Sequence, residues 1–212
     1  IKKNKTPFYL YSEKQIKENY LNFVKAFKNV NPLVCFATKA NANLVILKKL
    51  KKLGSGADVV SGGELLKALK AGIKPSKIVF SGVGKTEEEI KLAINKKILL
   101  INVESESEAQ LINNIAKRSN KKISIGFRLN PDIDAKTHEK ISTGKIDNKF
   151  GVSIKSFSDF YKNIKRYKNI KIDALSVHIG SQILNDNPFK KTLKVLAKVI
   201  HNLDIKLKYV DL

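Results

Sequence analysis

The sequence predicts an α/β fold, a (β/α)8 barrel that is truncated after about the seventh strand. Short apolar runs, rich in β-branched residues, alternate with segments whose apolar residues recur at helical spacing. That alternation predicts right-handed βαβ units and a parallel sheet buried on both faces. A polar or charged side chain also lies at or just past the end of each run: Lys39, Ser61, Ser81, Glu104, Arg128, His178 and Asp211. An open doubly wound sheet gathers its ligand groups near one switch point, whereas a barrel gathers all its strand ends at one mouth, so the barrel is favoured.

The apolar runs predict strands because they are short, β-branched and bounded by Gly, Asn, Ser or Lys. In order, the predicted strands cover residues 33–37, 57–60, 78–80, 98–103, 123–129, 172–177 and 207–212. A full barrel has eight strands. The chain therefore lacks one strand needed for closure.

Helices are predicted between the first five strands, over residues 43–54, 61–72, 85–95 and 104–119. Gly54 and Gly72 are typical C-terminal stops of the first two helices. Thr86, followed by acidic residues, opens the third helix. Ser105 and Glu108 have the spacing of a capping box at the start of the fourth.

We expect two parts in the chain. Residues 1–30 should form a strand and a helix that lead into the barrel, and residues 31–212 should form the incomplete barrel. Residues 130–151 are polar with little apolar periodicity, which is typical of a functional loop, and we expect a lid over the barrel mouth. The chain has no methionine and ends in the apolar run "LKYVDL", so we interpret it as a segment of a longer protein.

The composition is that of a globular protein. The chain has 212 residues, of which 42% are hydrophobic and 28% charged. No apolar run approaches the roughly 20 residues that a membrane-spanning helix requires, and the first residues lack the apolar core of a signal peptide. A single cysteine, Cys35, excludes an internal disulfide. We expect a cytoplasmic protein with no membrane partner, in which this thiol is buried and inert.

The formal net charge of +22 suggests a nucleic-acid partner at first sight, because basic faces bind phosphate. However, Arg118, Arg128 and Arg166 are the only arginines, and bidentate recognition of phosphates and bases favours arginine over lysine. The many lysines also accompany abundant Asn and Ile, as A/T-rich codons would produce. We therefore expect a solvated basic surface and no nucleic-acid partner.

Three patterns resemble known sites without meeting their requirements. "SGVGKT", residues 81–86, resembles the end of a phosphate-binding P-loop, but Val79 stands where its first glycine belongs. "GSGADV", residues 54–59, begins like a dinucleotide-binding fingerprint, but Val59 replaces its third glycine. The histidines lack metal-ligand spacing, so no metal site is predicted: they are His138, His178 and His201.

Two residues near strand ends are open to a structural or a chemical interpretation. Lysine is absent from most predicted strands, as burial requires, but Lys39 follows an apolar run and is flanked by small residues. Partial desolvation there would favour a neutral, nucleophilic amine; alternatively, the side chain extends to solvent. His178 follows another apolar run and is either a core histidine or a ring at the barrel mouth. The local pattern leaves both choices open.

Several motifs together resemble a known family. They are "FATKANAN", "GADVVSGGELLKALKAG", "KIVFSGVGKTEEEI", "NVESESE", "RLNPDIDAKTHEKISTGKIDNKFG" and "HIGSQI". In this order they resemble the diaminopimelate decarboxylases, pyridoxal-phosphate enzymes with an alanine racemase-like barrel. The likeness runs from Pro7 to Leu212. "KAN" is shared with ornithine and arginine decarboxylases, whereas "DAKTHEKISTG" and "HIGSQI" are closer to the diaminopimelate branch.

The resemblance implies roles for particular residues. Lys39 is expected to carry pyridoxal 5'-phosphate as a Schiff base and His178 to stack on the cofactor ring, and these two are the expected catalytic residues. Ser181 is expected to help bind the phosphate, and Arg128 to lie near the hydroxyl side of the ring.

Two further residues match positions near the cofactor in related decarboxylases, Asp58 and Glu64, although Glu64 alternatively caps the following helix. The resemblance implies that a homodimer decarboxylates meso-2,6-diaminopimelate to L-lysine and carbon dioxide, the last step of lysine biosynthesis. The family's C-terminal β domain is absent here, so we expect the segment alone to be inactive. The alternatives left open are a decarboxylase of ornithine, arginine or carboxynorspermidine, a racemase, and a non-catalytic pyridoxal-phosphate-binding barrel.

Overall fold

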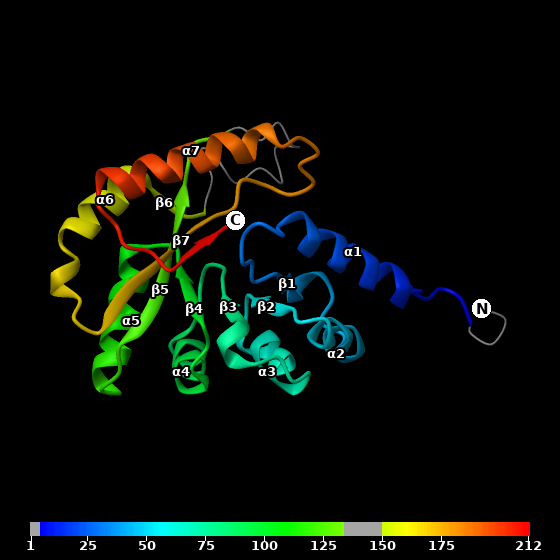
Figure 1. The fold of residues 1–212 in the computed structure, drawn as a ribbon. Helices are drawn as coiled ribbons and strands as arrows, with labels where there is room; N and C mark the ends of the chain where they lie inside the picture. The colour runs from blue at the N-terminus through cyan, green and yellow to red at the C-terminus, as the bar shows by residue number, and fades with distance from the viewer. Residues whose placement is uncertain (1–4, 134–149) are drawn as a thin grey trace.

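A single parallel sheet, with helices along its outer side, forms the framework of the protein (Figure 1). The computed structural model describes residues 5–133 and 150–212. Its strands are β1 (Cys35–Ala37), β2 (Gly56–Val59), β3 (Ile78–Phe80), β4 (Leu100–Val103), β5 (Ile123–Asn130), β6 (Val152–Ser153), β7 (Ile170–Val177) and β8 (Tyr209–Asp211). Its helices are α1 (Glu13–Ala26), α2 (Leu44–Lys52), α3 (Gly62–Lys70), α4 (Glu87–Lys96), α5 (Glu106–Arg118), α6 (Ile154–Lys162) and α7 (Asn187–Asn202). Short 3-10 helices are η1 (Thr38–Ala40), η2 (Pro75–Lys77) and η4 (Ile164–Arg166).

The strand order confirms the predicted βαβ architecture. The sheet runs β1-β2-β3-β4-β5-β7-β8, and every pair is parallel. All seven predicted strands are present, and α2 to α5 follow one another along one side of the sheet (Figure 1). The additional strand, β6, pairs with the last two residues of β5. A strand of two residues is too short to produce a periodic pattern, which is why the sequence did not reveal it.

The two faces of the sheet differ because side chains alternate along each strand. Phe80, Phe127 and Leu175 belong to the main core cluster, which the helices cover from outside. Val79 and Ala174, their neighbours along β3 and β7, belong to a second, smaller cluster on the opposite face. That opposite, inner face is only partly apolar, whereas the sequence predicted apolar burial on both faces.

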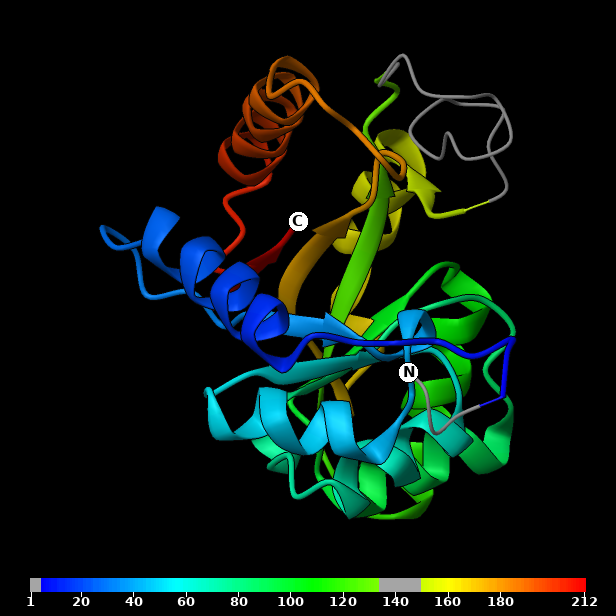
Figure 2. The same cartoon turned by 90° about the vertical axis from the view of Figure 1, so that its right-hand side faces the viewer.

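The sheet is an open arc of a barrel. Within the described residues, β1 and β8 each have one strand neighbour, so the arc does not close. The strand direction turns along the arc: the first strands, blue and cyan, lie nearly horizontal in Figure 2, whereas β5, green, stands nearly upright. The Asn102 amide Nδ2 on β4 donates a 2.6 Å hydrogen bond to Asp211 Oδ2 on β8, although these strands are not sheet neighbours. Such a contact across the inner face requires a curved sheet and confirms the prediction of an incomplete barrel.

The N-terminal segment contains the predicted helix, α1, which begins at the cap Ser12 and is tied to α2 by a 2.7 Å ion pair between Glu13 and Lys49. The structure has no strand between residues 5 and 30, in contrast to the sequence prediction. Tyr9 and Leu10 are 89% and 75% exposed, and neither belongs to the sheet that the described residues form.

The helix caps match the sequence closely, with one correction. A capping box is present at α4, where Thr86 and Glu89 exchange hydrogen bonds. At α5, Ser105 Oγ accepts from the Glu108 N–H, but the Glu108 carboxylate accepts from the N–H of Glu104 instead of the N–H of Ser105. The capping box predicted at α5 is therefore wrong, because the carboxylate bonds to the N–H of the residue before the N-cap and not to that of the N-cap itself. Most of the predicted lid, residues 134–149, lies outside the described residues.

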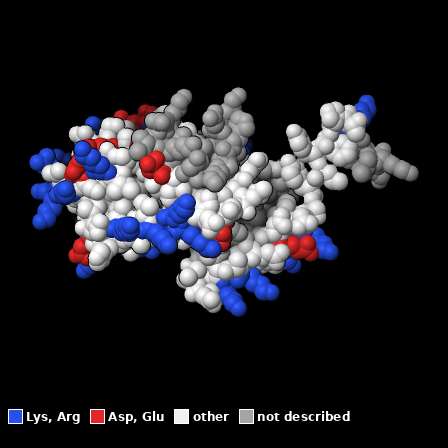
Figure 3. All heavy atoms as spheres, turned by 90° about the horizontal axis from the view of Figure 1, so that it is seen from above, with Lys and Arg blue, Asp and Glu red and all other residues white. Residues whose placement is uncertain are grey.

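The basic side chains do not gather in one patch on the face that Figure 3 shows. Seen from above, Lys and Arg form several separate groups, some at the margin and one on the face itself, with neutral surface between them. Within residues 5–133 and 150–212, no helix is both long enough and apolar enough to cross a membrane.

Candidate functional site

Polar side chains converge on the inner face toward the carboxyl ends of the strands. They come from β2, β3, β4, β5 and β8 and the segments after them: Asp58, Ser81, Asn102, Glu104, Arg128 and Asp211. Because parallel strands all end at one edge, side chains that are far apart in sequence meet there.

Lys39 lies at this edge, in η1 directly after β1. The following asparagines shape the turn: Asn41 Oδ1 accepts from the Asn43 N–H at 3.0 Å, and Asn43 Oδ1 caps α2 through the Val45 N–H at 2.8 Å. The Lys39 side chain is exposed. Of the two interpretations that the sequence left open, the structure therefore shows the side chain that extends to solvent, on a residue that follows an edge strand of the described sheet.

Asp58 faces the inner side of β2 and has a perturbed acidity. Burial raises its pKa to about 6; a hydrogen bond from Ser81 and the charge of Lys39 oppose the shift, while the charge of Asp211 adds to it. The Asp58 Oδ1 atom is buried and accepts no hydrogen bond from the described residues. Lys39 and Asp58 are thus close enough to interact electrostatically, and one carboxylate oxygen is left for a ligand or a water.

His178 stands just after β7, at the same edge of the sheet. Its side chain keeps contact with solvent, yet neighbouring atoms partly desolvate the ring, and this lowers its pKa below the ordinary value. The positive charges of Arg128 and Lys39 lower the pKa further. His178 is therefore a neutral imidazole near pH 7, placed among cationic groups.

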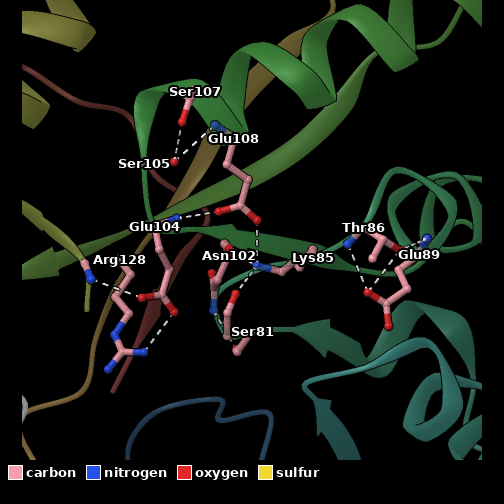
Figure 4. A network of polar contacts seen from close by, with 12 residues as sticks. Ser81, Lys85, Thr86, Glu89, Asn102, Glu104, Ser105, Ser107, Glu108 and Arg128 are labelled. Carbon is pink, nitrogen blue, oxygen red and sulfur yellow. Dashed lines mark hydrogen bonds and ion pairs between the residues drawn. The ribbon is translucent and has the colours of Figure 1, made fainter. Parts of the chain in front are cut away.

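Arg128, on β5, is held by an ion pair at the base of the site (Figure 4). Its Nη1 lies 2.9 Å from Glu104 Oε1, and the exposed fractions of the two side chains are 12% and 4%. The guanidinium carbon lies 5.2 Å from the centroid of the Phe150 ring, a cation–π distance.

The other two predicted residues are less closely connected to this group. Glu64 Oε2 accepts from the Val60 N–H at 2.9 Å, and Ser61 caps the Glu64 N–H, so Glu64 braces the start of α3. Its charge also raises the pKa of Asp58. Ser181 is exposed in the loop after β7, and among the described residues no polar contact joins it to the others.

The sequence missed a buried lysine beside the site. Lys85 belongs to the P-loop-like stretch, but its side chain is 1% exposed, and its Nζ donates to the carbonyl oxygens of Gly82 and Asn102 and pairs with Glu108 at 2.8 Å (Figure 4). Those contacts leave Lys85 no role in phosphate binding. Local sequence could not reveal it, since its partners lie on β4 and α5.

Cys35 is the remaining nucleophile near the inner face. Burial, together with the charges of Asp211 and Asp58, raises its pKa to about 12. The thiol therefore stays protonated, as an inert thiol would, although Cys35 is half-buried and not fully buried as the sequence predicted.

The donor set suits pyridoxal phosphate, an aromatic aldehyde that carries a phosphate and a phenolic hydroxyl. Lys39 offers a primary amine, Arg128 offers N–H donors to an anionic oxygen, and His178 offers a flat ring. The buried oxygen of Asp58 without a hydrogen-bond partner is the kind of atom that a bound ligand satisfies.

Comparison with known proteins points to the same cofactor. Residues 13–212 match the family model described as "Pyridoxal-dependent decarboxylase, pyridoxal binding domain". The chain is 48% identical over 210 residues to a diaminopimelate decarboxylase of Helicobacter pylori, covering 98% of this chain and 52% of that protein. It is 44% identical over 210 residues to that of Aquifex aeolicus, covering 98% of this chain and 50% of the relative. The chain thus spans about half the length of the curated relatives it matches.

Solved structures agree with the fold. The crystal structure of diaminopimelate decarboxylase from Helicobacter pylori complexed with L-lysine superposes with a TM-score of 0.95 at 46% identity, covering 99% of this chain and 54% of that one. A viral arginine decarboxylase, 21% identical, shares the fold with a TM-score of 0.81. The match over residues 13–212 and the lysine, imidazole and guanidinium at the sheet edge lead to one conclusion: the chain belongs to the pyridoxal-dependent decarboxylase family, as a pyridoxal binding domain.

Proposed function

We propose that this chain is the pyridoxal-phosphate-binding half of an enzyme that decarboxylates meso-2,6-diaminopimelate to L-lysine and carbon dioxide. The observation that carries the proposal is the placement of Lys39 at the carboxyl edge of the sheet, where its charge acts on both Asp58 and His178. The identity to diaminopimelate decarboxylases along nearly the whole chain supports this substrate over other basic amino acids.

Each inner-face residue has a distinct task in the proposal. Lys39 Nζ is the nucleophile to which the cofactor attaches. The His178 ring packs against the cofactor ring, and its low pKa keeps it neutral so that it does not repel the neighbouring cations. Arg128 donates N–H groups to an anionic oxygen of the cofactor. When bound, pyridoxal phosphate supplies an electron sink for the electron pair that remains when carbon dioxide leaves.

Other residues of the site act by charge and hydrogen bonding. Asp58 is a carboxyl group with a pKa of about 6, so its Oδ atoms hold or release a proton near neutral pH beside Lys39. Ser181, in the exposed loop after β7, offers a hydroxyl group to the phosphate. Glu64 supports the site indirectly, by bracing the start of α3 and by its charge near Asp58.

The proposal extends to assembly and location. We infer a cytoplasmic homodimer, in which residues 1–30 precede the barrel and residues 31–212 form the cofactor-binding part. The single cysteine and the family relationship support this inference. Analytical ultracentrifugation of the full-length protein tests it, and a monomer at working concentration would contradict the dimer.

The decisive experiment replaces Lys39 in the full-length protein. Lys39→Ala is expected to lose the visible absorbance of the bound cofactor and all release of carbon dioxide from meso-diaminopimelate, with an unchanged far-UV circular dichroism spectrum. Lys48→Ala is the matched control, because Lys48 is an exposed lysine one turn into α2. We expect this control to keep both signals.

A substrate panel separates the alternatives. Faster release of carbon dioxide from ornithine, arginine or carboxynorspermidine would replace the proposed substrate. Racemisation without carbon dioxide would indicate a racemase, and cofactor absorbance without any turnover would indicate a non-catalytic binding protein. Cofactor binding that survives in the Lys39→Ala variant would refute the role of Lys39.

A further inference from the structure

We propose that Glu104 is a positioning residue of this site, which holds the Arg128 guanidinium in the orientation that an anionic group of the bound cofactor or substrate requires. The inference deepens the proposed function and rests on it. Glu104 was visible in the sequence only as one of several polar residues at strand ends.

Each oxygen of the Glu104 carboxylate accepts a hydrogen bond, and the two donors come from different parts of the chain (Figure 4). Oε1 accepts from Arg128 Nη1 at 2.9 Å, and Oε2 accepts from the Gly151 N–H at 3.0 Å. Glu104 as a whole is 8% exposed. A buried carboxylate with two donors is fixed in place, and it fixes its partners in turn.

The Glu104 backbone is fixed by a hydrogen bond to the start of α5. Its N–H donates to Glu108 Oε2 at 2.8 Å, and Glu108 Oε1 pairs with the buried Lys85 Nζ at 2.8 Å. This chain of contacts runs from the loop after β3, through the start of α5, to the end of β4. Glu104 therefore projects from a rigid support, as a residue that sets the geometry of another must.

Two neighbours orient the Arg128 guanidinium, and they do not use all of its N–H donors. Glu104 engages one guanidinium nitrogen, and Phe150 lies against the face of the group. Arginine has five N–H donors in a planar fork. Among the described residues no further acceptor is bonded to this guanidinium, and we assign the remaining donors to an anionic oxygen of a ligand.

The Glu104 carboxylate also links Arg128 to Gly151, in the segment just before β6. Gly151 has φ of +78°, and a Cβ atom at this position would lie 3.0 Å from the Arg128 carbonyl oxygen. The Gly151 backbone can therefore approach β5 closely enough to donate to Glu104. Arg128 and the turn that precedes β6 thus share one carboxylate.

The test compares Glu104→Gln, Arg128→Gln and the double variant in the full-length enzyme. We expect Glu104→Gln to lower kcat/KM for meso-diaminopimelate by about 10- to 100-fold, the range found when a supporting group is removed. Because Glu104 acts through Arg128, the double variant should be no worse than Arg128→Gln alone. A purely structural contribution would instead add to the loss.

A second readout comes from His178, since the charge of Glu104 raises its pKa and the charge of Arg128 lowers it. Glu104→Gln is expected to lower the pKa of His178, measured by NMR titration of its ring. If that variant does not fold, Glu104→Asp, which keeps the charge on a shorter side chain, replaces it in the kinetic measurements, and the pKa of His178 should then stay close to that of the wild type. Glu88→Gln, at an exposed site on α4, is the control.

The outcomes separate this inference from the proposed function. Wild-type kcat/KM and cofactor affinity in both Glu104 variants, or additive losses in the double variant, would overturn the role of Glu104 and leave the proposed function intact. A wild-type protein that binds no pyridoxal phosphate would overturn the proposed function, and the role of Glu104 with it.

Discussion

At the scale of single residues, the inner face sets an exposed amine beside a half-buried carboxyl group. Ala37 on β1 lies in register with Asp58 on β2, and Lys39 follows two residues later. Desolvation makes the charged form of Asp58 costly, and the nearby negative charge of Asp211 adds to that cost. The positive charge of Lys39 reduces it. The pair therefore keeps a titratable carboxyl group beside the amine that the proposed chemistry uses.

Asp58 leads to a prediction about stability and pH. Its pKa rises from 3.8 to about 6 on folding, so the folded state binds more protons than the unfolded state between these values. Stability contributed by this group is present below pH 3.8 and is lost as the pH rises to about 6. Asn at this position does not ionise. Asp58→Asn should therefore gain stability relative to the wild type across this window, by about 1–2 kcal/mol after allowance for solvent contact.

Urea unfolding of the cofactor-free protein at a series of pH values measures this difference. The exposed Asp159→Asn variant on α6 is the control and should show no such trend. A difference between Asp58→Asn and wild type that stays constant with pH would show that Asp58 has an ordinary pKa in the folded protein.

At the scale of elements, three helices begin with a similar arrangement of hydrogen bonds. A Ser or Thr caps each of α3, α4 and α5, and a glutamate three residues later returns its carboxylate to a nearby N–H. Glu89 also accepts from the Gly62 N–H at 2.7 Å, which ties α4 to α3. These caps hold the carboxyl edge of the sheet in a fixed shape, and the candidate site is built on that edge.

Local patterns predicted most of these elements, because a short apolar run or a capping spacing depends only on neighbours in the chain. Strands such as β3 and helices such as α3 were therefore expected from sequence. The role of Lys85 was not, since its burial depends on Glu108 from the next unit. The hydrogen bond of Asn102 was not predicted either, because its partner Asp211 comes from β8, which is distant in the sequence. The exposure of Lys39 was not predicted either, and this residue follows β1, which lies at one edge of the sheet that the described residues form.

Gly126 gives a prediction about how the strands pack. It lies on β5 opposite Asn102 in the sheet register. A Cβ atom at this position would lie 2.2 Å from Asn102 Oδ1 and 3.2 Å from Leu100 Cδ2. Gly126→Ala must therefore displace the Asn102 amide, which holds β8. We expect a loss of about 1–3 kcal/mol in the free energy of unfolding, as is typical of overpacking, together with weaker cofactor binding.

The matched control is Gly63→Ala in the first turn of α3, where the nearest atom to a new Cβ is 3.9 Å away. Alanine favours a helix over glycine, so this change should be neutral or slightly stabilising. Equal effects of the two substitutions in chemical denaturation would argue against a steric role for Gly126.

At the scale of the whole molecule, the arc has two free ends. β1 and β8 each pair on one side only within the described residues, and apolar side chains lie near both. Leu33, Val210 and Leu212 are 37%, 45% and 56% exposed. In α1, the apolar residues Leu21 and Phe23 are 43% and 54% exposed. Unpaired strand edges with apolar neighbours are sites of association, because they offer both hydrogen bonds and apolar contact.

The 212-residue chain in isolation is therefore expected to self-associate at micromolar concentration and to unfold over a broad temperature range, whereas the full-length protein should melt cooperatively. Sedimentation velocity and calorimetry of the two proteins measure the difference. The net charge of +22 opposes association at low salt, so added salt should strengthen it, the opposite of what nucleic-acid binding would show. Val210→Lys places a charge on the β8 edge and should reduce association. A monomeric isolated chain with a sharp melting transition and decarboxylase activity would mean that the open edges are stable without further chain.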